Sequence, residues 1–165
     1  MNPRNQVYLR NFIFGIEDSL VSTVGLLSCI ASAGVPRTTI VLTGIVLIFV
    51  EAFSMAAGSF LAESSVEEYT RTEKKAAGEA VAGGAIMFFS YFLAGIIPIF
   101  PYVASGISNP FAISILASLA SLFALGVVSG KLTTGKLLRH GMRMLVIGGI
   151  ATFVGIIAAE VVRSL

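Results

Sequence analysis

The fold is decided by an apolar stretch at residues 38–62, which reads TTIVLTGIVLIFVEAFSMAAGSFLA. A transmembrane helix needs about 20 predominantly apolar residues to cross about 30 Å of hydrocarbon, and this stretch is long enough to do so. Four runs of similar length and composition lie at residues 12–33, 80–104, 109–130 and 142–164. They are longer than the strands of a membrane barrel and do not alternate between polar and apolar residues. The sequence therefore predicts an all-α membrane protein with five transmembrane helices.

The composition supports this fold class and excludes several kinds of function. Mean hydropathy is +0.92 and 12% of the residues are charged, against about 25% in a soluble domain. One cysteine, Cys29, and one histidine, His140, allow neither a disulfide framework nor a His-based zinc site nor a Ser-His triad. The net charge of +2 comes without any basic-aromatic pattern, so we expect no nucleic-acid partner. We expect one transmembrane domain over residues 1–165, with no enzymatic activity and no cofactor.

The distribution of basic residues predicts the orientation in the membrane. With five spans, nine of the 11 Lys and Arg residues fall on the side of the N-terminus, and only Arg37 and Arg163 fall on the other. Because cytoplasmic loops carry an excess of Lys and Arg, we expect a cytoplasmic N-terminus and a C-terminus on the opposite side. The nine residues are Arg4, Arg10, Arg71, Lys74, Lys75, Lys131, Lys136, Arg139 and Arg143.

Three carboxylates interrupt the apolar runs, namely those of Glu17, Asp18 and Glu51. A charged side chain near the bilayer centre costs about 2.5 to 3.5 kcal/mol, so an acid kept there often marks an ion or proton pathway. By helical rise, Asp18 lies about 9 Å into the run at 12–33. Met55 lies about 10 Å from the end of the antiparallel run at 38–62, and Glu51 lies about 6 Å further in. Asp18 and Met55 are therefore expected at one level, with Glu51 one turn deeper.

The pairing of a carboxylate with a thioether favours a transition metal as the ligand. Oxygen ligands alone suit Mg²⁺ or Ca²⁺, whereas sulfur is a softer ligand. We therefore predict that Asp18, Met55 and Glu51 bind a divalent metal ion. Five helices are too few to enclose a hydrophilic pathway, and small residues such as Gly15 and Ser19 recur at helix-packing spacing. We expect a homodimer in the lipid bilayer, with the pathway near its two-fold axis.

A second acidic group follows the run at 38–62, in a short charged link at residues 63–79, and we expect the helix to continue into this link as a polar segment through Glu67 and Glu68. Glu63 and Glu67 are one helical turn apart, so they share a face on which they could collect metal ions from the cytoplasm. Arg71, Lys74 and Lys75 lie close by in the sequence. A solvated link whose charges pair with one another is therefore an equally good interpretation.

Four segments match a known pattern in chain order: FGIEDSLVST at residues 14–23, EAFSMAAGSFL at 51–61, SYFLAGIIP at 90–98 and GMRMLVIGG at 141–149. Together they resemble the vacuolar iron transporter family over nearly the whole chain. The resemblance implies a five-helix homodimer that exports Fe²⁺ or Mn²⁺ from the cytosol in exchange for H⁺. It also implies that Asp18 and Met55 are the metal ligands inside the membrane.

The sequence departs from the family pattern at two places. Some plant and protist members carry a second-helix glutamate two turns before the methionine, where this chain has Leu47, and Glu51 lies only one turn before it. The long glutamate-rich cytoplasmic domain of the family is reduced here to residues 63–79. So compact a chain favours a bacterial or archaeal plasma membrane over a vacuole.

Two other functions are compatible with the sequence. One is a non-transporting membrane scaffold that docks a metal-storage partner. Such a scaffold would have no need of the long metal-collecting domain, which is reduced in this chain. A small organic-cation exporter would use an intramembrane carboxylate inside an aromatic cavity, and the chain has 12 phenylalanines but no tryptophan. Metal-stimulated proton movement would identify a carrier, because metal binding displaces protons from its ligands.

Overall fold

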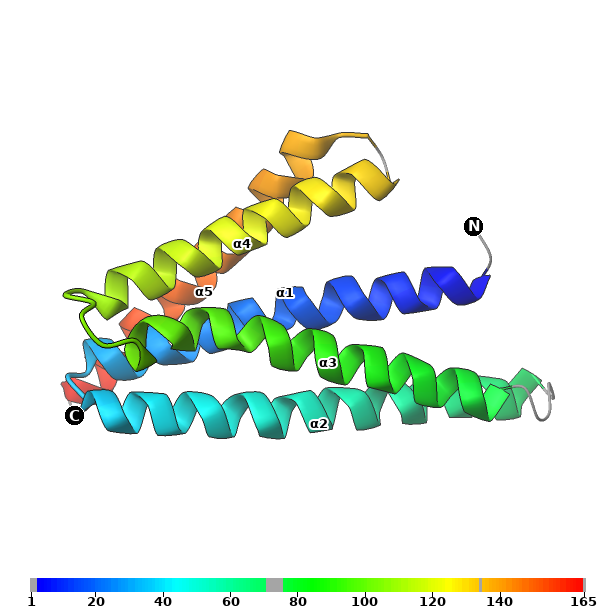
Figure 1. Cartoon of the computed structure of the whole chain (residues 1–165), viewed down its shortest axis with the longest axis horizontal. Coiled ribbons are helices and arrows are strands. Elements are labelled where there is room, and N and C mark those ends of the chain that lie inside the picture. The colour runs from blue at the N-terminus through cyan, green and yellow to red at the C-terminus, as the bar shows by residue number, and fades with distance from the viewer. Residues whose placement is uncertain (1–2, 71–75, 134, 165) are drawn as a thin grey trace.

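The computed structural model describes residues 3–70, 76–133 and 135–164, and this part of the chain forms five α-helices (Figure 1). The helices are α1 (Pro3–Ser32), α2 (Arg37–Thr70), α3 (Ala76–Val103), α4 (Pro110–Thr133) and α5 (Leu137–Arg163). Each of the five contains a segment long and apolar enough to cross a membrane. The predicted all-α class and the five spans are confirmed.

Local signals in the sequence set the ends of the helices. α1 ends just before Gly34, which has a φ of +78°, a backbone conformation that glycine adopts at little cost. Pro36 follows and has no N–H with which to continue the helix. α4 begins at Pro110, and Asn109 Oδ1 accepts a hydrogen bond of 3.1 Å from the backbone N–H of Ala112, as a helix cap does.

Two helices extend beyond the apolar runs that predicted them. α1 begins at Pro3 rather than near residue 12, whereas α2 continues past residue 62 to Thr70, as the predicted polar continuation of this helix indicated. These extensions are more polar than the spans, so hydropathy does not mark them. The charged link predicted at residues 63–79 is consequently helical at both of its described ends.

α1 is the central helix of the bundle and contacts each of the other four (Figure 1). α2 packs along α3, and α5 packs along α4. Within the described residues α2 contacts neither α4 nor α5. The start of α1, the end of α2, the start of α3 and the α4–α5 turn lie at one end of the bundle, called the N-terminal end below (Figure 1).

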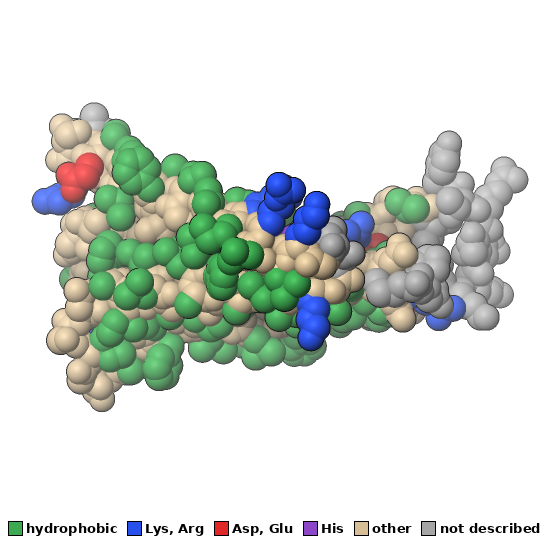
Figure 2. Space-filling view, turned by 90° about the horizontal axis from the view of Figure 1, so that it is seen from above, with side chains coloured by type: hydrophobic (Ala, Val, Ile, Leu, Met, Phe, Trp, Pro, Cys, Tyr) green, Lys and Arg blue, Asp and Glu red, His purple; other side chains and the backbone are tan. Residues whose placement is uncertain are grey.

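Apolar side chains fill the interior and also cover the outside. One buried cluster joins α1, α3, α4 and α5 through Leu20, Ala94, Leu122, Leu125 and Met144. Large apolar side chains are exposed around the bundle, as expected for a surface that faces hydrocarbon (Figure 2). The fold is that of a multi-pass membrane protein.

Small residues bring α1 and α3 into close contact. A Cβ atom at Gly15 would collide with the side chain of Ser90. One turn further along α1, Ser19 Oγ donates a hydrogen bond of 2.6 Å to the backbone carbonyl of Tyr91. Close approach and interhelical hydrogen bonds hold transmembrane helices together, because lipid supplies no hydrophobic drive between them. This contact fixes the position of α3 relative to α1.

Candidate intramembrane metal site

Asp18 of α1 and Glu51 of α2 lie near one another inside the bundle. Their carboxylates are close enough to interact electrostatically, and both also act on the hydroxyl of Tyr91 of α3. We call these three residues the acidic cluster. Both carboxylates are partly rather than fully buried. Two neighbouring carboxylates provide the negative charge that a divalent cation requires.

Tyr91 is held in place by α1. Its side chain is fully buried, and its hydroxyl shares a hydrogen bond of 2.8 Å with the hydroxyl of Ser22. Ser22 lies one turn after Asp18, so one face of α1 carries both residues. Tyr91 could not be assigned a role before the fold was known, because a tyrosine within an apolar run carries no charge. Its importance follows only from the packing of α3 against α1.

A groove of about 610 Å³ lies between α1 and α2 and is also lined by α3. Phe14 of α1, Met55 of α2 and Met87 of α3 are among its walls. Each of these residues is one helical turn from the member of the acidic cluster on its own helix. Because α1 and α3 run away from the N-terminal end and α2 runs towards it, all three lie one turn nearer that end. The inner end of the groove therefore lies near the two carboxylates.

Two thioethers line this groove, of which the sequence predicted one. Met55 is partly buried and Met87 is 4% exposed. Met87 was missed because a methionine in an apolar run usually only fills space in the core. The helical rise placed Asp18 level with Met55 and Glu51 one turn deeper, and in the structure Asp18 and Glu51 interact electrostatically. Sulfur near carboxylate oxygen suits a transition metal better than Mg²⁺ or Ca²⁺.

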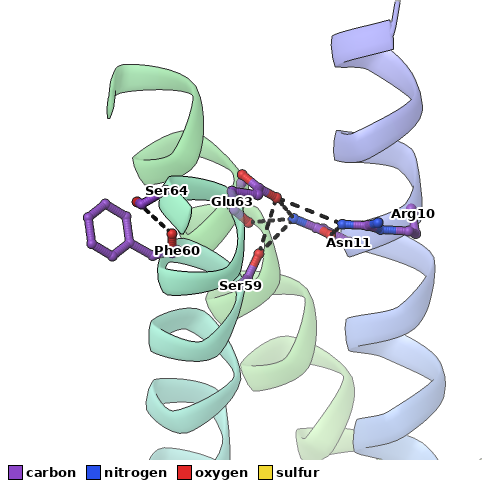
Figure 3. A network of polar contacts seen from close by, with 7 residues as sticks. Arg10, Asn11, Ser59, Phe60, Glu63 and Ser64 are labelled. Carbon is purple, nitrogen blue, oxygen red and sulfur yellow. Dashed lines mark hydrogen bonds and ion pairs between the residues drawn. The ribbon is translucent and has the colours of Figure 1, made fainter. Parts of the chain in front are cut away.

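A hydrogen-bonded network joins α1, α2 and α3 at the outer end of the groove (Figure 3). At its centre is Asn11 of α1, which is 1% exposed. Its side-chain amide donates to Ser59 Oγ and to Glu63 Oε1, each at 2.9 Å, and to the backbone carbonyl of Gly83 at 3.3 Å. Arg10 adds a 4.0 Å ion pair to Glu63. We call these five residues the junction network.

Glu63 is one of the two predicted metal-access residues, and the side chain of the other, Glu67, lies outside the described residues. The Glu63 side chain is 15% exposed and lines a second cavity of about 310 Å³ at the N-terminal end. Arg10 and Ala62 line both this cavity and the groove. The junction network therefore lies between the two cavities, and a metal ion at Glu63 would compete there with Asn11 and Arg10.

Glu17 lies beside Asp18 in the sequence but interacts with a different helix. Its carboxylate interacts electrostatically with Arg143 of α5 as well as with Asp18. Within the described residues, no three His, Cys, Asp or Glu side chains converge as a metal site. One chain thus offers a carboxylate pair and two nearby thioethers, and a second copy across a two-fold axis would double this set.

Antiparallel helices that cross a membrane and hold two carboxylates between them define a multi-pass membrane protein with an intramembrane polar site. Such acids mark ion or proton pathways. The chain belongs to the VIT family, whose family model matches residues 9–83 and 66–160.

The chain is also similar to a curated relative, the vacuolar iron transporter of Plasmodium berghei (strain Anka). The two are 34% identical over 80 residues, which is 44% of this chain and 29% of the relative. The match thus spans less than a third of that protein. The resemblance found in the sequence is confirmed at the level of the family.

Proposed function

We propose that this chain exports a divalent transition metal ion, Fe²⁺ or Mn²⁺, from the cytosol in exchange for protons. The observation that carries the proposal is the meeting of Asp18 and Glu51 at the inner end of a groove lined by thioethers. Membership of the VIT family supports metal transport, and the name of the Plasmodium relative supports iron as the cargo. A transporter family also supports the expectation that the chain is not an enzyme.

The proposed route follows the order of the cavities. A metal ion enters the cavity at the N-terminal end, passes the junction network beside Glu63 and reaches the groove with Met55 and Met87. It then binds Asp18 and Glu51 one turn deeper. Each step replaces part of the hydration shell with protein oxygen or sulfur, which lowers the cost of moving a doubly charged ion towards hydrocarbon.

Proton exchange follows from the electrostatics of the acidic cluster. Two ionised carboxylates near one another in an apolar region repel each other, and either a divalent cation or protons can relieve that repulsion. Metal binding therefore releases protons, and metal release takes them up again. Acidifying the metal-loading side slows loading, because protons then compete with the metal for the same oxygens.

The proposal includes a homodimer with its N-terminus in the cytoplasm of a bacterial or archaeal cell. Nine of the 11 basic residues belong to the N-terminal side of the five-span arrangement, as cytoplasmic segments require. A dimer completes the ligand set, since two carboxylates and two thioethers per chain leave room for the same groups from a partner.

Reconstitution in proteoliposomes tests this function with matched variants. We expect Asp18→Asn and Glu51→Gln each to abolish Fe²⁺ and Mn²⁺ flux and metal-dependent proton release. Glu160→Gln is the control, because this exposed acid pairs with Arg163 at 3.1 Å at the other end of the bundle and should leave both signals intact. Unchanged flux in Asp18→Asn would remove that carboxylate from the pathway.

The same assay separates the alternative functions. If the folded wild-type protein moves neither metal nor protons, a membrane scaffold becomes the better description. If it moves an organic cation such as ethidium but no metal, it is an organic-cation exporter. Neither result is compatible with the proposed metal transport.

A further inference from the structure

We propose that the hairpin of α4 and α5 binds the headgroup of an anionic phospholipid. The site consists of Lys131 at the end of α4 and of Arg139 and Arg143 in the first two turns of α5, which we call the hairpin cations. All three side chains are exposed. The inference concerns a lipid partner and holds whether or not the chain transports a metal.

The hairpin cations lie in a part of the chain without acidic residues. No Asp or Glu occurs in the sequence between Ala80 and Ala159, so neither α4 nor the adjoining part of α5 supplies a countercharge. Within the described residues, neither Arg139 nor Lys131 forms an ion pair. Arg143 interacts electrostatically with Glu17 but does not form an ion pair with it.

Two other cations at the same end of the described chain form ion pairs within the protein. Arg4 of α1 pairs with Glu79 of α3 at 2.7 Å. Arg10 of α1 lies 4.0 Å from Glu63 of α2. Among the residues that the structure describes at this end, Arg4 and Arg10 of α1 are thus paired with acids, whereas basic side chains lie exposed on the α4–α5 face (Figure 2).

An apolar stripe continues from the cations along α5. Arg139, Arg143, Val146 and Ile150 follow one another at helical spacing on one face. Val146 is 50% exposed and Ile150 is 57% exposed. Two guanidinium groups beside exposed aliphatic side chains match a phospholipid, whose phosphate pairs with arginine while its acyl chain runs along the helix.

The depth of the hairpin favours a lipid over an acidic soluble protein. The α4–α5 turn is set back from the ends of α2 and α3, which project further at the N-terminal end (Figure 1). Arg143 accordingly lies within electrostatic range of Glu17, well inside α1. Cations at this depth, next to hydrocarbon-facing side chains, lie where lipid phosphates are found.

Native mass spectrometry of the purified full-length chain, titrated with phosphatidylglycerol or phosphatidylcholine, tests the site. We expect tighter binding of phosphatidylglycerol, and a roughly 25-fold loss of that binding in Arg139→Gln/Arg143→Gln, from about 1 kcal/mol per cation. Arg4→Gln/Arg10→Gln is the matched control. This control removes two positive charges from the same end of the bundle, but from arginines that are paired with acids. It should therefore keep the preference for phosphatidylglycerol over phosphatidylcholine.

Three results would overturn the proposal. They are equal binding of the two lipids by the wild type, equal losses in the two double variants, and a change of oligomeric state in place of lipid loss. Equal losses would mean diffuse surface charge, and an altered oligomer would mean that the cations contact a second copy. If the glutamine variant does not fold, Arg139→Lys/Arg143→Lys must retain binding of phosphatidylglycerol, since charge is preserved.

Discussion

Replacing Asn11 by alanine should loosen the junction between α1, α2 and α3. The amide has two N–H donors shared among three acceptors, so the variant loses about one neutral and one charge-assisted hydrogen bond. These are worth about 1 and about 2 kcal/mol, because Glu63 keeps a largely buried carboxylate with fewer partners. The expected loss of stability is about 3 kcal/mol. Hydrogen bonds between transmembrane helices average nearer 0.6 kcal/mol, which sets a lower bound of about 1 kcal/mol.

Thermal unfolding in detergent, followed by circular dichroism, measures this loss. For a chain of this length about 3 kcal/mol corresponds to a fall in Tm of roughly 6 to 12 °C, and the lower bound to roughly 2 to 4 °C. Asn5→Ala, an exposed position on the same helix, is the control and should leave Tm unchanged. Asn11→Asp should be less stable than Asn11→Ala, because it places a second carboxylate beside Glu63. If Asn11→Ala unfolds at the wild-type temperature, the junction network does not hold the helices together.

Two further predictions concern α3. Met87→Leu conserves volume, so the fold and Mn²⁺ flux should persist while inhibition of that flux by the softer ion Cd²⁺ weakens several-fold; an unchanged inhibition constant would exclude a sulfur contact at this position. Tyr91→Phe removes the hydroxyl that bonds Ser22 and should slow metal flux at a cost of about 1 kcal/mol in stability, measured by initial rates and Tm. Flux equal to that of the wild type would limit Tyr91 to a packing role.

The transmembrane helices could be predicted from the sequence because lipid imposes a simple rule on them. Apolar runs bounded by residues such as Gly34 and Pro110 fix the spans to within a few residues. The polar extension of α1 to Pro3 was not predicted, since a helix outside the hydrocarbon has no apolar signal, and that of α2 was predicted only as far as Glu68. The central position of α1 could not be predicted either, because nothing in a single sequence states which helices touch.

The residues of the candidate site likewise divide into those that could be predicted from the sequence and those that could not. Asp18 and Glu51 were identifiable because a charge within an apolar run is costly wherever that run packs. Met87 and Tyr91 resemble ordinary core residues until α3 is placed against α1 and α2. Asn11 was missed for a related reason. An asparagine near the start of a helix is compatible with several solvent-exposed roles, and only the packing of α1 against α2 and α3 reveals that this one is buried.

The sparse anchoring of α2 has a mechanical consequence. This helix carries Glu51 and Met55, yet within the described residues it contacts only α1 and α3. The rest of its surface, including Phe53 at 71% exposure, faces the outside of the bundle. Bilayer thickness and lateral pressure act directly on the tilt of such a helix, and that tilt sets the distance from Glu51 to Asp18. The membrane thereby becomes part of the geometry of the acidic cluster.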